Sequence, residues 1–156
     1  MSMESHTALW RRLDIPGKEA CSVTLLGGGW KVAGFAAFVH DEERWVLNYA
    51  VSCDEAWRTL SAEVMGWGAD RNIKVGITRD TSGLWRLNGE ERQAVAGCTD
   101  IDLNFSPSTN MLPIRRLGLA VGETAAVRAA WLRFPSFELE PLEQSYTRTG
   151  ENLYRY

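Results

Sequence analysis

Short groups of turn-forming residues recur along the whole chain and most constrain how it can fold. They separate stretches in which apolar and polar residues alternate. The groups are Gly27-Gly28-Gly29, Asp41-Glu42, Asp80-Thr81-Ser82-Gly83, Asn88-Gly89, Ser106-Pro107-Ser108, Gly122 and Pro135. Strands joined by tight turns produce this pattern, whereas long helices do not. The sequence therefore predicts a mainly β fold of antiparallel strands.

The alternation is clearest in three stretches. Residues 44–52 place four large apolar side chains on one face of a strand: Trp45, Leu47, Tyr49 and Val51. Residues 72–79 repeat the pattern with Ile73, Val75 and Ile77. Residues 84–95 contain Asn88-Gly89, a strong signal for a two-residue hairpin turn because both residues tolerate positive φ.

Two segments are ambiguous. Residues 53–67 have a helix N-cap candidate in Asp54 and apolar residues at helical spacing, but they also alternate. Residues 123–134 are rich in Ala and Arg, which favour helix, yet alternation fits them as well. The local pattern leaves helix and strand open for both.

Length and charge restrict the class of protein. A chain of 156 residues is the size of one domain, and we expect a single domain over residues 1–156. The net charge of −3 argues against a nucleic-acid partner, because phosphate binding needs a surplus of basic residues. Fourteen of the 17 basic residues are Arg, which suits fixed bidentate pairing.

The cysteines and the N-terminus indicate location. The three cysteines, Cys21, Cys53 and Cys98, are widely spaced and form no C-x-x-C pair, so no zinc site or disulfide framework is expected. The N-terminus lacks the apolar stretch of a secretory signal. Residues 20–39 contain Lys31 and three glycines, which makes a membrane-spanning helix implausible. We expect a cytoplasmic protein without metal or cofactor.

The most unusual stretch is residues 97–117, which read GCTDIDLNFSPSTNMLPIRRL. Asp100, Asp102 and Asn104 match the start of a calcium-binding loop, but Phe105 stands where a glycine is needed and Met111 where a glutamate is needed. We expect a strand over 98–105 instead. Its core face would hold Ile101, Leu103 and Phe105, and the two aspartates with Asn104 would share the other face.

This shared face allows an enzymatic hypothesis. Side chains two residues apart on a strand lie about 6.5–7 Å apart, within the range of inverting glycosidase carboxylates. Two solvated aspartates are the simpler interpretation. The chain has no G-x-S-x-G motif, and its histidines are His6, near the terminus, and His40, in a charged turn. No catalytic residue is predicted.

The two adjacent arginines are predicted to have different roles. If residues 98–105 and 112–121 form a hairpin across the loop 106–111, Arg116 lies beside Asp100 and Asp102, and Asn110 belongs to the turn. Arg115 then falls on the apolar side. There it either extends to the rim of the sheet or lines a ligand pocket.

Several segments together resemble a known family. They are WRRLDIPGKE at 10–19, LNYAVSCDEAWRT at 47–59, GLWRLNG at 83–89, residues 97–117, FPSFELEPLEQSY at 134–146 and the closing YRY. The chain resembles the bacterial "putative glycolipid-binding" proteins, formerly catalogued as a domain of unknown function. The resemblance implies an open β-barrel similar to periplasmic lipoprotein carriers and a mycobacterial glycolipid carrier. On that basis both ambiguous segments are expected to be strands.

The resemblance also implies a function. It points to a glycolipid or a related amphiphile held in an apolar barrel cavity, with no enzymatic role. Six residues are the ligand-binding candidates: Trp45, Tyr49, Arg58, Arg115, Gln144 and Tyr146. Core packing and strand-edge pairing are the alternative for all six. The other hypotheses are an enzyme acting on a sugar or small hydroxylated substrate through Asp100, Asp102 and Arg116, and an oligomerising module that binds a protein partner.

Overall fold

The structure is a computed structural model that describes residues 5–156, and it consists mainly of two β-sheets. The first sheet has eight antiparallel strands in chain order: β1 Ser5–Arg11, β2 Gly17–Leu26, β3 Gly29–His40, β4 Glu43–Cys53, β5 Thr59–Gly68, β6 Arg71–Arg79, β7 Trp85–Leu87 and β8 Glu90–Glu91. The second sheet has the order β12-β11-β10-β9, with β9 Ile101–Leu103, β10 Thr124–Arg133, β11 Glu138–Gly150 and β12 Leu153–Arg155. The predicted mainly β fold is confirmed.

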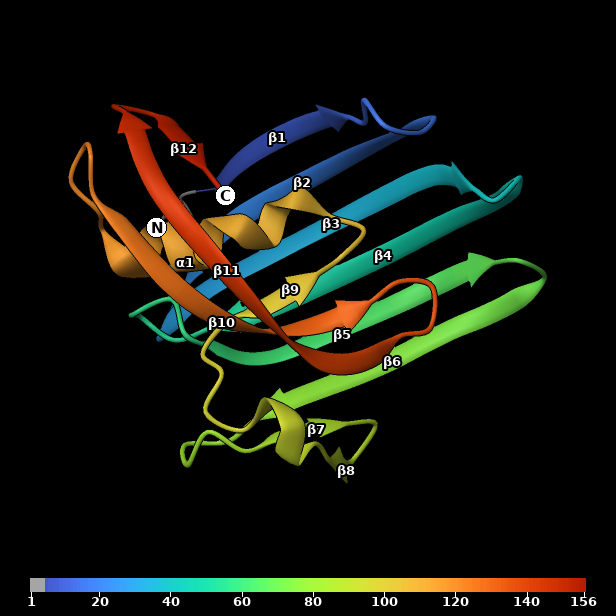
Figure 1. Cartoon of the computed structure of the whole chain (residues 1–156). Coiled ribbons are helices and arrows are strands. Elements are labelled where there is room, and N and C mark those ends of the chain that lie inside the picture. Colours follow the sequence, from blue (N-terminus) through green and yellow to red (C-terminus); the bar gives the residue numbers. More distant parts are fainter. Residues whose placement is uncertain (1–4) are drawn as a thin grey trace.

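Three short helical segments complete the chain. They are two 3₁₀ helices, η1 Gln93–Val95 and η2 Pro107–Asn110, and the α-helix α1 Met111–Leu117. Figure 1 shows the first sheet curving behind the second, with β9 and α1 between them. The two sheets thus form an open, half-closed barrel. Across residues 5–156 we find no helix with the length and apolar character needed to cross a bilayer.

The strands follow the alternation of the sequence. The predicted core face of β4 is buried, with Trp45, Leu47, Tyr49 and Val51 each at most 4% exposed. The Asn88-Gly89 turn joins β7 to β8 with positive φ at both residues. Small residues make room for the large ones, because a side chain at Gly34 would collide with the Tyr49 ring and one at Gly68 with the Trp45 indole.

Both ambiguous segments contain strands. Residues 59–68 form β5, and residues 124–133 form β10. Asp54 does not cap a helix: its carboxylate accepts hydrogen bonds from the backbone N–H groups of Ala56 and Arg58 and so closes the turn before β5. The strand interpretation, which came from the family resemblance, is correct for both.

The hairpin expected between residues 98–105 and 112–121 is wrong. β9 pairs in parallel with β10, and residues 107–117 continue as η2 and α1. The Ser106 side chain accepts a hydrogen bond from the Ser108 N–H, and Pro107 follows at the first helical position. A capping serine followed by proline is typical of a helix start, and the same two residues are also common in turns.

Because residues 111–117 are helical, the expected geometry of the two arginines also changes. Successive residues on a helix are about 100° apart, so Arg115 and Arg116 do not point to opposite faces of a sheet. The helix ends at Gly118, which adopts a left-handed conformation with φ of 56°.

The core lies between the two sheets, and the segment 98–117 fills much of it. Cys98, Ile101, Leu103, Phe105 and Leu112 pack in one apolar cluster with the inward residues of both sheets. Space for a ligand is therefore to be sought where the two sheets fail to close on each other.

Candidate functional site

Two adjoining clefts lie along the seam between the two sheets. The first cleft has a volume of about 730 Å³ and lies between β1–β2, the segment 102–110 and the second sheet. The second cleft, of about 830 Å³, lies between β1–β2, α1 and the β11–β12 end of the second sheet. Both are lined by Trp10, Pro107, Asn110 and Tyr156, so they are neighbours. We call them together the seam clefts. Their volumes fall in the range of small-molecule sites.

The linings of the two clefts differ. In the first cleft, aromatic and aliphatic side chains alternate with groups that form hydrogen bonds: Glu19, Asp102, Asn104, Asn110 and Gln144. The second cleft has apolar walls from Ala8, Val23, Met111, Ile114 and Leu153, with Arg115 among them. The second cleft is also lined by His6, Arg148 and Glu151, so the two clefts differ in the kind of polar group that they carry and not simply in polarity.

Glu19 is a buried carboxyl group in the wall of the first cleft. It lies on β2, is 5% exposed, and accepts hydrogen bonds from the Tyr49 hydroxyl and, at 2.6 Å, from the Ser106 hydroxyl. Burial raises the pKa of Glu19, and the two hydrogen bonds oppose that shift. Among the described residues, two neutral hydroxyl groups and no directly bonded cation therefore hold this carboxyl group.

Asp102 is the second carboxyl group of the first cleft. Gln144 Nε2 donates to Asp102 Oδ2 at 2.6 Å, and the Tyr146 hydroxyl donates to Asn110 Oδ1 at 2.8 Å. Burial raises the pKa of Asp102, while the bond from Gln144 lowers it. Burial, followed by the nearby aspartates, also raises the pKa of Tyr146. Two amide side chains and a phenol thus lie beside Asp102.

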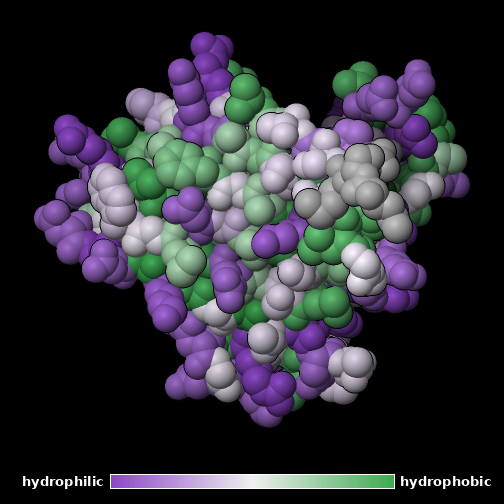
Figure 2. Space-filling view, turned by 180° about the vertical axis from the view of Figure 1, so that it is seen from behind, coloured by the Kyte–Doolittle hydropathy of each residue, from purple (hydrophilic) through white to green (hydrophobic). Residues whose placement is uncertain are grey.

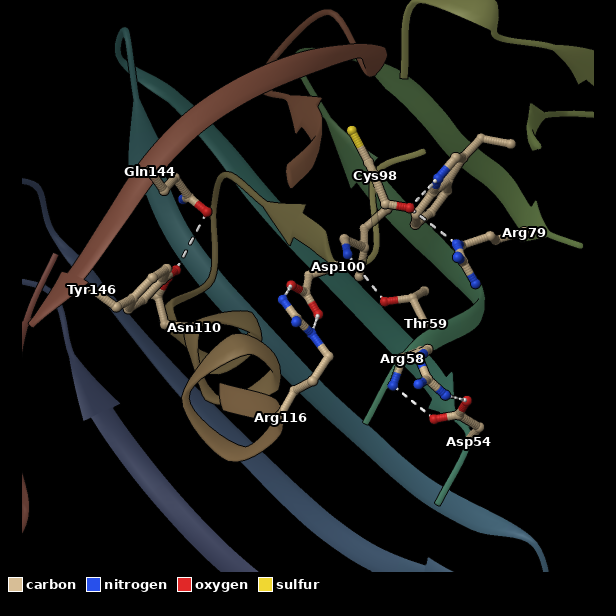
Figure 3. Close-up of polar contacts among 12 residues, drawn as sticks. Asp54, Arg58, Thr59, Arg79, Cys98, Asp100, Asn110, Arg116, Gln144 and Tyr146 are labelled. Atoms are coloured by element: carbon tan, nitrogen blue, oxygen red, sulfur yellow. Dashed lines mark hydrogen bonds and ion pairs between the residues drawn. The ribbon is translucent and has the colours of Figure 1, made fainter. Parts of the chain in front are cut away.

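Asp100 has a different environment. Arg116 forms a bidentate ion pair with it, with Nε–Oδ1 at 3.1 Å and Nη2–Oδ2 at 2.5 Å, and Asp100 is 1% exposed (Figure 3). Asp100 lines neither seam cleft, and Asp102 takes no part in the ion pair. Asp100 and Arg116 therefore lie outside the cleft that Asp102 lines, and the three residues do not form the acid–base site of the enzymatic hypothesis.

The structure brings part of the predicted binding set together. Gln144 lines the first cleft, and the Tyr146 hydroxyl lies 3.4 Å from Gln144 Oε1. Arg115 lines the second cleft, while Tyr49 lies behind Glu19. Asn110 does not serve a hairpin turn; it ends η2 and lines both clefts.

Two candidates lie elsewhere. Arg58 pairs with Asp54 at 3.2 Å and lines neither seam cleft; Figure 3 shows this pair apart from Gln144 and Tyr146. Trp45 packs against Phe134, with ring centroids 4.7 Å apart, and lines a further cleft that adjoins the first one through Arg11, Arg12, Lys18 and Phe38. Its indole N–H has no hydrogen-bond partner among the described residues.

Sequence reasoning missed Glu19 and Trp10. The signal was present, because alternation in β2 puts Glu19 on the same face as the apolar residues Cys21 and Val23. A charged residue on a core face needs partners or a cavity. Within residues 5–156, no group of three or more His, Cys, Asp or Glu side chains could hold a metal ion.

The comparison with protein families agrees with this fold. A family model described as "Putative glycolipid-binding" matches residues 7–156. The chain belongs to that family. A crystal structure of a DUF1089 family protein from Pseudomonas aeruginosa is similar, with 30% sequence identity and a TM-score of 0.78. The match covers 93% of this chain and 78% of that one. No curated protein matches the chain.

Proposed function

We propose that the protein binds an amphiphile with a hydroxyl-rich head group in the seam clefts. The observation that carries the proposal is that a cleft lined by carboxyl and amide groups shares Trp10, Asn110 and Tyr156 with a cleft that has apolar walls. The head group occupies the first cleft and the hydrocarbon chain occupies the second. The ligand thus lies along the seam and not in the filled centre of the barrel.

The first cleft suits hydroxyl groups because its polar side chains supply both acceptors and donors. The carboxyl groups of Glu19 and Asp102 accept hydrogen bonds, and the amides of Asn104 and Gln144 can do both. Trp10 and Trp131 offer flat apolar surfaces with an N–H at the edge, which suits the apolar face of a sugar ring. A ligand rich in O–H groups could add hydrogen bonds to the carboxyl groups of Glu19 and Asp102, neither of which forms an ion pair within residues 5–156.

The second cleft suits a hydrocarbon chain. Met111, Ile114 and Leu153 supply apolar surface, and burying a chain against it gains roughly 25 cal/mol per Å². Arg115 is exposed and lines this cleft, so it can contact an anionic or carbonyl group of the ligand. The family's description supports a ligand of this class. Action in the cytoplasm remains a prediction.

Native mass spectrometry of freshly purified protein, before and after incubation with a bacterial lipid extract, tests the proposal. We expect an adduct with the mass of a glycolipid. Gln144→Ala removes one hydrogen-bonding wall group and should weaken binding about fivefold, the effect of losing one hydrogen bond. Gln93→Ala, on the exposed η1, is the matched control and should bind normally. No adduct from any extract would refute the proposal.

A further inference from the structure

The outer face of the first sheet carries large apolar side chains that are exposed to solvent. Alternation turns one side chain in two of β1–β6 away from the core. The large apolar ones among these include Leu9, Phe35, Met65 and Trp67, with exposures of 81%, 45%, 50% and 50%. Figure 2 views the molecule from behind Figure 1, the side on which this sheet lies, and shows apolar residues across the middle of the surface. A large exposed apolar area usually marks an interaction site.

The strand register shows that these side chains are neighbours. One cross-strand row runs through Leu9, Ala20, Phe35, Asn48 and Met65, and the adjacent row contains Ala37, Val46 and Trp67. We call Leu9, Ala20, Phe35, Ala37, Val46, Met65 and Trp67 the outer patch. It spans β1 to β5 as one surface, interrupted only by Asn48.

The outward-facing charged residues of strands β1–β6 are mostly positive. In β1–β6 the outward-facing charged residues are five cations, Arg11, Lys18, Lys31, Arg44 and Lys74, and one acid, Glu63. All three lysines of the chain are in this set, although the net charge of the chain is −3. None of the five cations forms an ion pair with another residue in the range 5–156.

Two details refine this charge pattern. Arg44 adjoins the acidic turn Asp41-Glu42, Lys74 lies diagonally across from Glu63, and Asp14, in the turn that joins Arg11 to Lys18, is paired with Arg12. Arg11 and Lys18 are directly opposite each other across β1 and β2. Like charges in that position destabilise a sheet, so an external anion would relieve the repulsion.

The charge pattern selects one kind of partner. Two copies of this face would bring their cations together, which disfavours a symmetric dimer. A nucleic acid would leave the outer patch without an apolar partner. A membrane with anionic lipids offers both complements, since it attracts Lys and Arg and takes aromatic side chains at its interface.

We propose that the outer patch and its surrounding cations dock the protein on the surface of a membrane that contains anionic lipids. The docking surface is distinct from the seam clefts, so it goes beyond the function proposed above. The two regions meet at β1–β2, because Arg11 and Lys18 also line the rim of the first cleft. Docking therefore brings the entrance of the first cleft to the bilayer, from which an amphiphile would be taken up.

Sedimentation with vesicles tests this proposal. The full-length protein is mixed with vesicles of phosphatidylcholine alone or with about one third phosphatidylglycerol, at low and high salt. We expect binding to the anionic vesicles that weakens with salt. Lys18→Gln/Lys74→Gln should weaken partitioning on the order of 25-fold, because each cation near an anionic surface contributes about fivefold. Phe35→Ser/Met65→Ser should weaken it at least as much.

The controls change one cation and one large apolar residue elsewhere on the surface. Arg155→Gln on β12 and Val121→Ser in the loop before β10 are exposed and should bind vesicles like the parent protein. Circular dichroism checks that each variant is folded. The proposal is overturned if the parent protein leaves anionic vesicles unbound, if the Lys18/Lys74 variant binds undiminished, or if light scattering shows a dimer that Phe35→Ser dissociates. Each outcome is independent of the native mass spectrometry of the seam clefts.

Discussion

Asp100 and Asp102 are separated by one residue, yet the fold gives them opposite roles. Asp100 is buried, and its two carboxylate oxygens accept hydrogen bonds from Nε and Nη2 of Arg116. Asp102 faces the first cleft, is held by the neutral amide of Gln144, and has a raised pKa because of burial. The first carboxylate ties α1 to the segment before β9, and the second is available to a ligand. Two acids one residue apart therefore differ: Asp100 anchors the fold through an ion pair, and Asp102 lines a cleft.

The largest effect should come from breaking the Asp100 pair. Arg116→Ala leaves a buried carboxylate without its cation, and we expect the free energy of unfolding to fall by about 3 kcal/mol. Urea denaturation measures the change. Arg128→Ala is the control, because its pair with Glu143 is exposed and should contribute under about 1 kcal/mol. Equal losses in the two variants would mean that Asp100 is not a structural anchor.

A smaller loss of stability is expected when a hydrogen bond to Glu19, in the wall of the first cleft, is removed. Tyr49→Phe removes the phenol that donates to Glu19, and this should lower the free energy of unfolding by about 1–2 kcal/mol. Because the lost hydrogen bond favoured the carboxylate, the pKa of Glu19 should rise further. NMR titration of the Glu19 side chain can follow the pKa. Tyr154→Phe, whose hydroxyl has no hydrogen bond to the described residues, is the control, and an unchanged pKa in Tyr49→Phe would contradict the assignment.

Asp102→Asn should change stability by less than about 1 kcal/mol at low pH, because the amide still accepts from Gln144. The sign of its pH dependence is informative. The folded state holds the Asp102 proton to higher pH than the unfolded state does, so stability falls as pH rises above 3.8 through the raised pKa.

The Asn variant lacks this titration. Its stability relative to the parent should therefore increase between about pH 4 and neutrality, as followed by urea denaturation at a series of pH values. Glu19 titrates in both proteins and cancels in the difference. A constant difference would show that Asp102 is not a buried carboxyl group with a raised pKa.

The smallest effect is expected at Arg58. Its pair with Asp54 is exposed and lies outside the seam clefts, so Arg58→Ala should leave glycolipid binding unchanged and alter stability by under about 1 kcal/mol. Isothermal titration with the ligand found by mass spectrometry measures the binding. Loss of binding in Arg58→Ala would contradict this account, because it would mean that Arg58 contributes to the ligand site.

Local alternation predicted strands such as β4 and β6, because a period of two directly reports which side chains face the core, but it left β5 and β10 open until the family resemblance was considered. Alternation failed at residues 106–117. Ser106 and Pro107 start a helical segment there, although the same two residues also occur in turns. The seam clefts depend on contacts far apart in sequence. Ser106 reaches Glu19 across 87 positions and Gln144 reaches Asp102 across 42, and no single-sequence pattern predicts such pairs.

Photocrosslinking with a diazirine-bearing glycosylated diacylglycerol tests the central claim most directly, since it records where the ligand lies. Irradiation of the complex followed by peptide mapping should label the lining of the seam clefts, chiefly Trp10, Tyr156 and residues 107–114. Unlabelled glycolipid in excess should suppress this labelling. Crosslinks confined to the outer patch or to the turn that holds Arg58, with none in the seam clefts, would contradict the account.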